Sequence, residues 1–367
     1  MRRTPALIVG GGPAGAAAAI TLARSGLRPL LVERGGKDRI VCGGFLGWDA
    51  LPALAGLGLD PAALGARPIS TVRILAGTRR VQTGLPGPAA GLSRARLDEA
   101  LLALAQEAGA EVLRATVRRI EGGRAVLADD TNIEADTVFV ATGKHALRGA
   151  ERSNVGADAY VGLRATIPRP ADLDHVIELH LFREGYAGLL VQEDGSANLC
   201  LSVSAARFRA AGGSAPKLAE ALQREAPMLA RLMGEAGSAW SAIAGIPYGW
   251  RAHDSESGRF RVGDQAGVIA SLVGDGIAMA LASGIGAAEA FLAGGANAAP
   301  YFQHALARRN RAPIGIAELV RKGAERPGFA RAALPILARM PAVIRIAANA
   351  TRVASHRLPL VGAAESG

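Results

Sequence analysis

The stretch Ala6-Leu7-Ile8-Val9-Gly10-Gly11-Gly12-Pro13-Ala14-Gly15 decides the fold of this chain of 367 residues. Its first four residues form a short apolar run of the kind that a buried parallel strand needs. Gly10, Gly12 and Gly15 follow at the spacing G-x-G-x-x-G, which is typical of a dinucleotide-binding turn between a strand and a helix. The pattern predicts a Rossmann-like unit at the start of the chain.

Each glycine of this motif has a mechanical role. Gly10 permits the tight turn out of the strand, Gly12 lets a pyrophosphate approach the backbone, and Gly15 lets the next helix pack closely on the sheet. That helix, expected at residues 14–24, directs its free N–H groups at the phosphates. A second strand ends in Glu33, whose carboxylate can accept hydrogen bonds from the adenosine ribose. Because strand, turn, helix, strand and acid occur in order, a bound dinucleotide is favoured over a plain glycine-rich turn.

Composition bounds the class of protein. Half of the residues are apolar, and the length suits about two domains with a sizeable core. Only 8 Phe, 4 Tyr and 3 Trp occur, so core and substrate pocket must be built mainly from aliphatic residues. Cys42 and Cys200 are far apart and suggest no disulfide framework, which fits a reducing compartment. The segment after Met1 resembles a secretory signal, but its Gly-Gly-Gly-Pro run would break a signal helix, so we expect a mature, cytoplasmic N-terminus.

The positive charge is concentrated near the C-terminal end. Of the formal net charge of +10, residues 301–367 carry +8, from 11 Arg or Lys against 3 acids. No nucleic-acid motif occurs and the basic residues are interleaved with apolar ones, so a membrane surface or an acidic partner is favoured over nucleic acid. The apolar stretch 266–288 is interrupted by Asp275, a charge that is costly at mid-bilayer, so no transmembrane helix is expected.

Four helices are expected in this basic region, at 301–312, 314–324, 327–340 and 342–355, separated by Pro313, Pro327 and Pro341. Basic and apolar residues fall on opposite helical sides, with Arg339, Arg345 and Arg352 on one and Val343, Ile346, Ala350 and Val353 on the other. Such a helix could lie on an anionic membrane. The alternative, which is favoured, is that it packs on its own domain with a solvated arginine face.

Two further segments are candidates for the dinucleotide site. Cys42-Gly43-Gly44 form a loop whose backbone could approach a flat ligand, the alternative being an ordinary loop with a small buried thiol. Ser93 caps a helix whose first turn contains Arg94, where positive charge is unfavourable unless an anion lies nearby.

Two later turns complete the set. The buried strand 138–142 ends in Thr142-Gly143, and the strand 259–263 is followed by Asp264. The segment 272–277, which contains Gly274, Gly276 and Ile277, leads into a helix to about residue 292 whose N-terminus is a ready anion site.

Residues 160–204 are β-rich and predict a separate antiparallel sheet, hence a second domain. His180 is expected to be a partly solvated residue of that sheet. The predicted fold class is α/β, with a Rossmann-like dinucleotide-binding domain, an antiparallel β-sheet substrate domain and C-terminal helices. The expected boundaries are 1–70, 92–150 and 245–298 for the first domain, 71–91 and 151–244 for the second, and 299–367 for the helical appendage.

With these motifs placed, the chain resembles the superfamily of FAD-dependent para-hydroxybenzoate hydroxylases and geranylgeranyl reductases. The resemblance spans about residues 5–295. Two runs, 41–46 and 141–148, are similar to flavoproteins that accompany type III polyketide synthases and act on alkylated phenolic lipids. The motifs that carry the resemblance are Gly10-x-Gly12-x-x-Gly15 with Glu33, Ser93-Arg94, Ala141-Thr142-Gly143, and Gly263-Asp264 followed by Gly274-Asp275-Gly276.

The resemblance implies FAD as the cofactor. It implies that Glu33 binds the adenosine ribose, that the Val117 backbone lies near the adenine, and that Arg94 contacts the flavin side. Asp264 would contact the ribityl or pyrophosphate region, and Gly276 and Ile277 would offer backbone amides to the isoalloxazine. The expected cofactor-binding residues are Gly10, Gly12, Pro13, Ala14, Gly15, Glu33, Arg34, Gly43, Gly44, Arg94, Val117, Thr142, Gly143, Asp264, Gly274, Gly276 and Ile277. The substrate candidates are Cys42, Tyr186, Tyr248 and Trp250, and neither a metal site nor a catalytic residue is identified.

The leading hypothesis for function is monooxygenation of a hydrophobic aromatic such as an alkylated phenol. By resemblance, transiently bound NAD(P)H would reduce FAD, and the ring would be hydroxylated through a flavin hydroperoxide. Thr142-Gly143, however, stand where hydroxylases usually carry Asp-Gly, and 185–190 lacks the reductase run Tyr-x-Trp-x-Phe-Pro. The alternatives are reduction of a lipid C=C bond, in which Cys42 would matter more, and a flavoprotein that only passes electrons or binds lipid.

Overall fold

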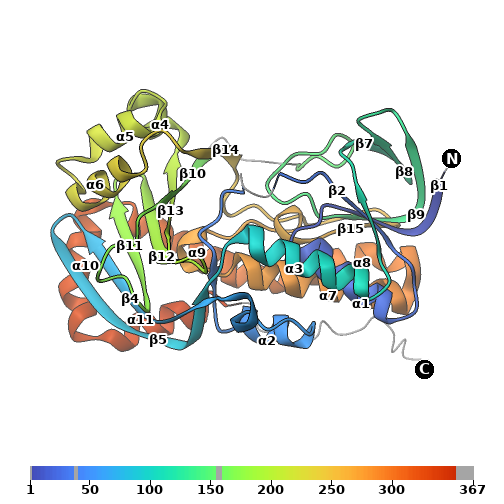
Figure 1. Ribbon diagram of the computed structural model, residues 1–367, viewed down its shortest axis with the longest axis horizontal. Helices are drawn as coiled ribbons and strands as arrows, with labels where there is room; N and C mark the ends of the chain where they lie inside the picture. The colour runs from blue at the N-terminus through green and yellow to red at the C-terminus, as the bar shows by residue number, and fades with distance from the viewer. Residues whose placement is uncertain (1, 37–39, 154–158, 353–367) are drawn as a thin grey trace.

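The computed structural model describes residues 2–36, 40–153 and 159–352. Two β-sheets lie side by side along the long axis of the molecule (Figure 1). One contains the N-terminal strand, and the other is formed largely by the middle of the chain. The α/β fold class is therefore as the sequence predicts.

The first sheet is built from seven strands in the order β6-β2-β1-β9-β8-β7, with β15 also paired to β9. The pairs β1–β2, β2–β6, β1–β9 and β9–β15 are parallel, and β7, β8 and β9 are antiparallel. The strands are β1 (Arg2–Val9), β2 (Leu30–Glu33), β6 (Glu111–Arg114), β7 (Val117–Glu121), β8 (Arg124–Leu127), β9 (Asn132–Val140) and β15 (Arg259–Arg261).

The helices of this half pack closely against one another. A Cβ on Gly284 of α7 would lie 2.1 Å from the backbone oxygen of Ala14 in α1, so the small residues of α7 allow this close approach. The shared core is rich in Ala and Leu and is completed by Phe139, Phe260 and Phe302. The helices are α1 (Pro13–Arg24), α2 (Ala50–Gly56), α3 (Arg94–Glu107), α7 (Gly276–Gly294) and α8 (Ala298–Arg309).

The second sheet has eight strands in the order β14-β10-β13-β12-β11-β4-β5-β3. All of its pairs are antiparallel except β4–β11, which is parallel and corrects the purely antiparallel prediction. Residues 45–46 and 67–70, assigned by the sequence to the first domain, also belong to it. The strands are β3 (Phe45–Leu46), β4 (Arg67–Ala76), β5 (Arg79–Gly91), β10 (Tyr160–Ile167), β11 (Val176–Phe182), β12 (Gly185–Val191), β13 (Ala197–Ser204) and β14 (Ser241–Ile246).

Helices cover both faces of this sheet. Three short helices pack on one face: α4 (Ala205–Ala210), α5 (Ala215–Leu222) and α6 (Pro227–Glu235). The leucines of α5 and α6 that are buried there are Leu218, Leu222, Leu229 and Leu232. The C-terminal helices α10 (Pro327–Arg339) and α11 (Pro341–Ala350) contact the opposite side through β4, β5 and β11, next to α9 (Arg311–Ala324). The helices α5 and α6 are separate because Pro227 begins a new one.

The last helix is oriented differently from the favoured prediction. Ile344, Ala347 and Ala348 face the sheet, whereas Val343 and Ile346, expected on the packed side, are exposed. The side chain of Arg352, expected on a solvated face, is buried. Val353 lies outside the described residues. Apolar residues therefore occur on both the inner and the outer side of α11.

One helical run in the described part of the chain, Gly276–Arg309 through α7 and α8, is long and apolar enough to cross a membrane by length and composition alone. In its most apolar window, 44% of the residues are buried inside the protein. Because α7 lies against α1 in the core, we read this run as the core helix of a globular protein.

Candidate active site

The Gly10–Gly15 turn connects β1 to α1 as the sequence predicts. Gly10 has a positive φ of 108°, and its N–H donates to the Val32 carbonyl oxygen at 2.9 Å. A Cβ on Gly15 would lie 1.9 Å from the Gly10 carbonyl oxygen. The helix begins with Pro13, has no side-chain cap, and carries no acid in its first turn. Its free N–H groups are therefore available to an anion.

Glu33 lies beside this turn at the end of β2. Its Oε2 accepts from the Gly11 N–H at 2.6 Å, and its Oε1 accepts from the Gly35 N–H at 2.9 Å. The Ala115 N–H donates to the Glu33 carbonyl oxygen at 3.1 Å, which places the start of β7, at Val117, near the same end of the sheet. Arg34 turns toward His145, with 2.7 Å between its Nη2 and the ring Nε2.

The loop Cys42–Gly44 is held from the second sheet. The buried side chain of Asn198 donates from its Nδ2 to the carbonyl oxygens of Cys42 and Gly43, at 3.0 and 2.7 Å. Asn198 is itself fixed by Arg164, whose Nε donates to its Oδ1 at 2.7 Å. The loop is therefore held in place by hydrogen bonds from the second sheet.

Arg94 lies against the glycine turn, within 3.1 Å of where a Cβ on Gly12 would stand. Its guanidinium makes two hydrogen bonds of 2.8 Å to the buried carboxylate of Asp98. Burial disfavours the charge of Arg94, but Asp98 outweighs it and raises the pKa above the usual value. Ser93 caps the helix, as predicted, by accepting from the Arg96 N–H.

The turn Thr142–Gly143 is tied to the segment after β15. Gln265, fully buried, donates from its Nε2 to Thr142 Oγ1 and to the Gly143 carbonyl oxygen, both at 2.9 Å. Lys144 pairs with Asp264 across 3.7 Å. Burial opposes the charge of Lys144, but the Asp264 carboxylate raises its pKa overall. These contacts join two segments that are about 120 residues apart in sequence.

The N-terminus of α7 begins at Gly276, where a Cβ would meet no atom within 4 Å. The preceding residue, Asp275, is completely buried. Its Oδ1 accepts from the Arg352 Nη1 at 2.7 Å, and the Arg352 guanidinium lies 3.8 Å from the centre of the Trp48 ring. The C-terminal region thus reaches the loop that was expected to bind the isoalloxazine.

These segments converge on a cavity of about 160 Å³ between the two sheets. Both helix N-termini open into it, and the residues in its wall come from widely separated motifs. Of the predicted cofactor and substrate residues, its wall contains Gly12, Pro13, Ala14, Cys42, Gly43, Gly44, Arg94, Gly143, Tyr248, Asp264, Gly274, Gly276 and Ile277. Gly10, Gly15, Glu33, Arg34, Val117 and Thr142 stand outside the wall, in the turns and strand ends around it.

FAD fits this arrangement on structural grounds. The α1 N-terminus carries uncapped N–H groups for a pyrophosphate, and Arg94 adds a fixed positive charge beside Gly12. The space at Gly276 admits a group close to the α7 backbone. Glu33 would hold the adenosine end, α1 the phosphates, and Gly276 and Ile277 the flavin, with Arg94 on the flavin side beside Gly12.

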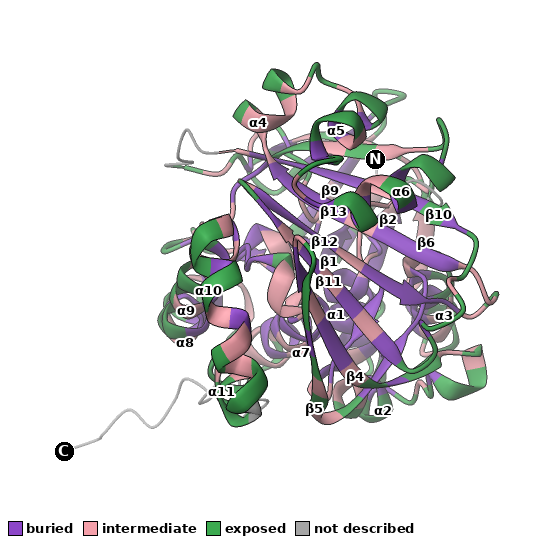
Figure 2. Cartoon of the chain, turned by 90° about the vertical axis from the view of Figure 1, so that its left-hand side faces the viewer, coloured by how far each residue is buried: buried purple, intermediate pink, exposed green. Residues whose placement is uncertain are grey.

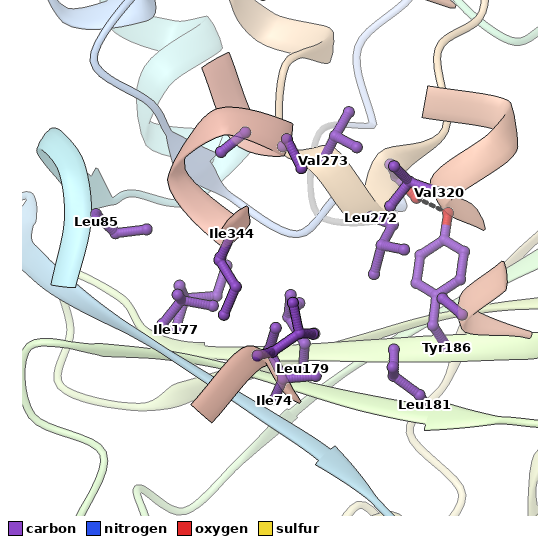
Figure 3. Close-up of a pocket in the computed structure, with 18 of the residues that line it drawn as sticks. Ile74, Leu85, Ile177, Leu179, Leu181, Tyr186, Leu272, Val273, Val320 and Ile344 are labelled. Atoms are coloured by element: carbon purple, nitrogen blue, oxygen red, sulfur yellow. Dashed lines mark hydrogen bonds between the residues drawn. The ribbon is translucent and has the colours of Figure 1, made fainter. Parts of the chain in front are cut away.

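A second and larger cavity, of about 580 Å³, adjoins the first. It lies between the second sheet and α9–α11, and its wall is mainly aliphatic, with four aromatic residues and few polar ones. Figure 3 shows Ile74, Ile177 and Leu179 on the sheet side and Ile344 opposite them. The two cavities meet because five residues line both of them: Gly43, Phe45, Cys200, Ser271 and Gly274.

A row of hydroxyl groups crosses the junction of the cavities. Tyr186, which lines the apolar cavity, is 2.7 Å through its Oη from Ser271 Oγ, as Figure 3 marks. Ser271 Oγ is 2.9 Å from Tyr248 Oη, and Ser202 Oγ donates to that same Oη at 3.1 Å. Burial raises the pKa of Tyr186 well above its ordinary value, so its phenol stays protonated near neutral pH.

Two other predictions about side chains need correction. Trp250 lines neither cavity, since its Nε1 donates to the Ser153 carbonyl oxygen at 2.8 Å. His180 is buried rather than partly solvated. Its Nε2 lies 2.7 Å from Glu178 Oε1, and the Glu178 carboxylate also accepts a hydrogen bond from Arg73 at 2.8 Å. No group of three metal-ligating side chains occurs among the described residues.

Several site residues carried no sequence signal. Ser271 and Cys200 join the two cavities, Lys144 and Gln265 organise the Thr142 turn, and Arg352 neutralises Asp275. Lys144 and Gln265 each follow directly on a recognised motif, and Ser271 directly precedes the segment 272–277. Their residue types and positions nevertheless match no pattern that marks a site residue.

Comparisons with known proteins find chains of similar fold. A family model described as lycopene cyclase protein matches residues 6–181, a little under half of the chain. The flavin-dependent brominase Bmp2 superposes with a TM-score of 0.74 at 17% identity, covering 94% of this chain and 93% of its own. PqsL, a probable FAD-dependent monooxygenase of Pseudomonas aeruginosa, gives 0.70 at 17%, with coverages of 89% and 98%. A geranylgeranyl bacteriochlorophyll reductase-like protein of Thermoplasma acidophilum gives 0.70 at 20%, with 89% and 91%. No curated protein matched.

The chain shares the fold of these flavin-dependent proteins, and FAD fits the segments around the smaller cavity. This is the fold that the resemblance of its motifs implied.

Proposed function

We propose that this protein is a monooxygenase that hydroxylates a hydrophobic aromatic compound, such as a phenol with an alkyl chain. The observation that carries the proposal is the aliphatic cavity of about 580 Å³ that opens onto the cofactor cavity. An elongated apolar molecule can fill this space and present one end to the cofactor. When bound, FAD supplies the activation of oxygen, and NAD(P)H serves as a transient reductant.

The polar groups at the junction suit a substrate with a hydroxyl at its reactive end. The remaining walls of the apolar cavity offer such a hydroxyl few partners, so its place beside Tyr186 and Ser271 is favoured. A protonated Tyr186 can donate to the substrate oxygen, and Ser271 and Tyr248 can relay a proton between the cavities. The aliphatic walls orient the chain and exclude water from the reacting end.

Replacing Tyr186 with phenylalanine tests this placement. The ring would still fill its part of the wall, while the hydroxyl would be lost. We expect KM for an alkylresorcinol to rise by about five- to tenfold, the cost of one hydrogen bond. The matched control is Tyr301→Phe on the exposed outer side of α8, which should leave KM unchanged. Equal KM values for Tyr186→Phe and the unchanged protein would refute the placement.

The alternative function, reduction of a lipid C=C bond, assigns a larger role to Cys42. Cys42 lines the cofactor cavity but not the apolar cavity, and Cys200, which lines both, has its pKa raised to about 12 by burial. We therefore expect Cys42→Ala to keep most of the hydroxylating activity. The reductase would be favoured if Cys42→Ala abolished turnover and if the unchanged protein gave a product that had gained two hydrogen atoms and no oxygen.

A further inference from the structure

The outer surface of the last three helices is unusually apolar. Seven of the ten large hydrophobic residues that are exposed in the described chain lie between positions 319 and 346. Leu319, Phe329 and Ile346 are each more than 60% exposed. Figure 2 shows α10 and α11 largely exposed on the side of the molecule that carries the second sheet. We call residues 319–346 of this outer surface the apolar rim.

The apolar rim borders the large cavity where that cavity opens to the surface. Leu319, Val320, Phe329 and Val343 are exposed and also line that cavity. The same side chains therefore form the inner wall and the outer surface. An apolar molecule could pass from this surface into the cavity without crossing a polar barrier.

Positive charge accompanies the apolar rim. Lys322, Arg326, Arg331, Arg339 and Arg345 are exposed on these helices and the turns between them. No Asp or Glu occurs from Arg326 to Arg352. Exposed aliphatic groups flanked by unbalanced arginines match an anionic lipid surface, which accepts the apolar groups and attracts the charges.

We propose that the apolar rim docks on an anionic lipid bilayer and that the cavity receives its substrate from that bilayer. This inference rests on the proposed function for the nature of the substrate, but the docking itself does not. A bilayer accounts for the apolar rim, the surrounding arginines and the position of the opening together. A protein partner would account for the first feature but would require acidic groups to match the charges.

Sedimentation of the FAD-loaded full chain with vesicles tests the docking. We expect binding to vesicles of phosphatidylcholine mixed with phosphatidylglycerol, and much weaker binding to phosphatidylcholine alone. The double variant Arg339→Glu/Arg345→Glu should lower the partition coefficient by about tenfold or more, and Phe329→Asp/Ile346→Asp should abolish binding. Tyr301→Asp, also exposed but on α8, is the matched control and should bind as the unchanged protein does.

The outcomes separate docking from catalysis. Absence of binding to anionic vesicles, or binding that both double variants retain, would overturn the proposal. A dimer in solution that Phe329→Asp/Ile346→Asp dissociates, without vesicle binding, would identify a second copy as the occupant and would also overturn it. Vesicle binding without hydroxylation would refute the proposed function alone, and hydroxylation of a short-chain phenol without vesicle binding would refute the docking alone.

Discussion

Replacing Gly15 with alanine is expected to abolish or severely weaken FAD binding. The added Cβ would lie 1.9 Å from the Gly10 carbonyl oxygen and 3.1 Å from the Cβ of Ala141. Neither backbone can move easily. Gly10 is fixed by its hydrogen bond to Val32, and Ala141 directly follows β9, which is paired with β1. Overpacking of this kind costs about 1–3 kcal/mol, and it would displace the N-terminus of α1 from the phosphates.

The measurement is the dissociation constant of FAD, followed by quenching of flavin fluorescence. We expect an increase of about ten- to hundredfold, the affinity equivalent of that cost. Gly315→Ala on α9 is the control, since a Cβ there would meet no atom within 4 Å. An FAD affinity in Gly15→Ala equal to that of Gly315→Ala would show that this turn does not hold the cofactor.

Replacing Arg352 with methionine is expected to destabilise both the C-terminal helices and the cofactor site. Asp275 is completely buried, and Arg352 Nη1 donates to its Oδ1 at 2.7 Å. Removing one member of a buried ion pair costs about 3–5 kcal/mol, because the remaining buried charge loses a counter-charge that offset its desolvation. The Asp275 carboxylate, deprived of this counter-charge, stands directly before Gly276, where the flavin is expected to bind.

The readouts are the free energy of unfolding and the FAD dissociation constant. Arg345→Met, an exposed change on α11, the helix that precedes Arg352, should alter the free energy of unfolding by no more than about 0.5 kcal/mol. The double variant Asp275→Asn/Arg352→Met should recover part of the loss, because it removes the buried charge. Equal effects of Arg352→Met and Arg345→Met would mean that this ion pair does not link the two regions.

The part of the fold that the sequence predicts well is the part encoded locally. The strand, glycine turn, helix and second strand around Gly10–Gly15 are adjacent in sequence, and each residue type has a separate physical reason to be there. The same holds for the Ser93 cap and for the start of α7 at Gly276. Half of the residues in the wall of the cofactor cavity are among those predicted from these motifs and from the resemblance.

The remainder depends on pairing between distant segments. The parallel pairing of β4 and β11 aligns Arg73 with Glu178, 105 positions later. This pairing explains why His180 is buried. Ser271 is likewise 85 positions from Tyr186. Nothing in the local sequence indicates either contact.

The C-terminal helix shows a further limit of prediction from the sequence. Its periodicity predicted an amphipathic helix, and α11 is one. Periodicity defines two faces, but which face turns inward depends on the surface against which the helix packs. Here the cavity accepts Ile344 and Ala347, so Val343 and Ile346 are left outside.

The most direct test of the proposed function is a single-turnover reaction with isotopically labelled oxygen. The purified, FAD-loaded protein is titrated anaerobically with NADPH and then NADH while flavin absorbance is recorded. It is then mixed with an alkylresorcinol and heavy-oxygen-labelled O2. For a monooxygenase we expect bleaching of the flavin by a nicotinamide and a product that carries one labelled oxygen atom. A product that has gained two hydrogen atoms and no oxygen, or consumption of oxygen without any product, would contradict it.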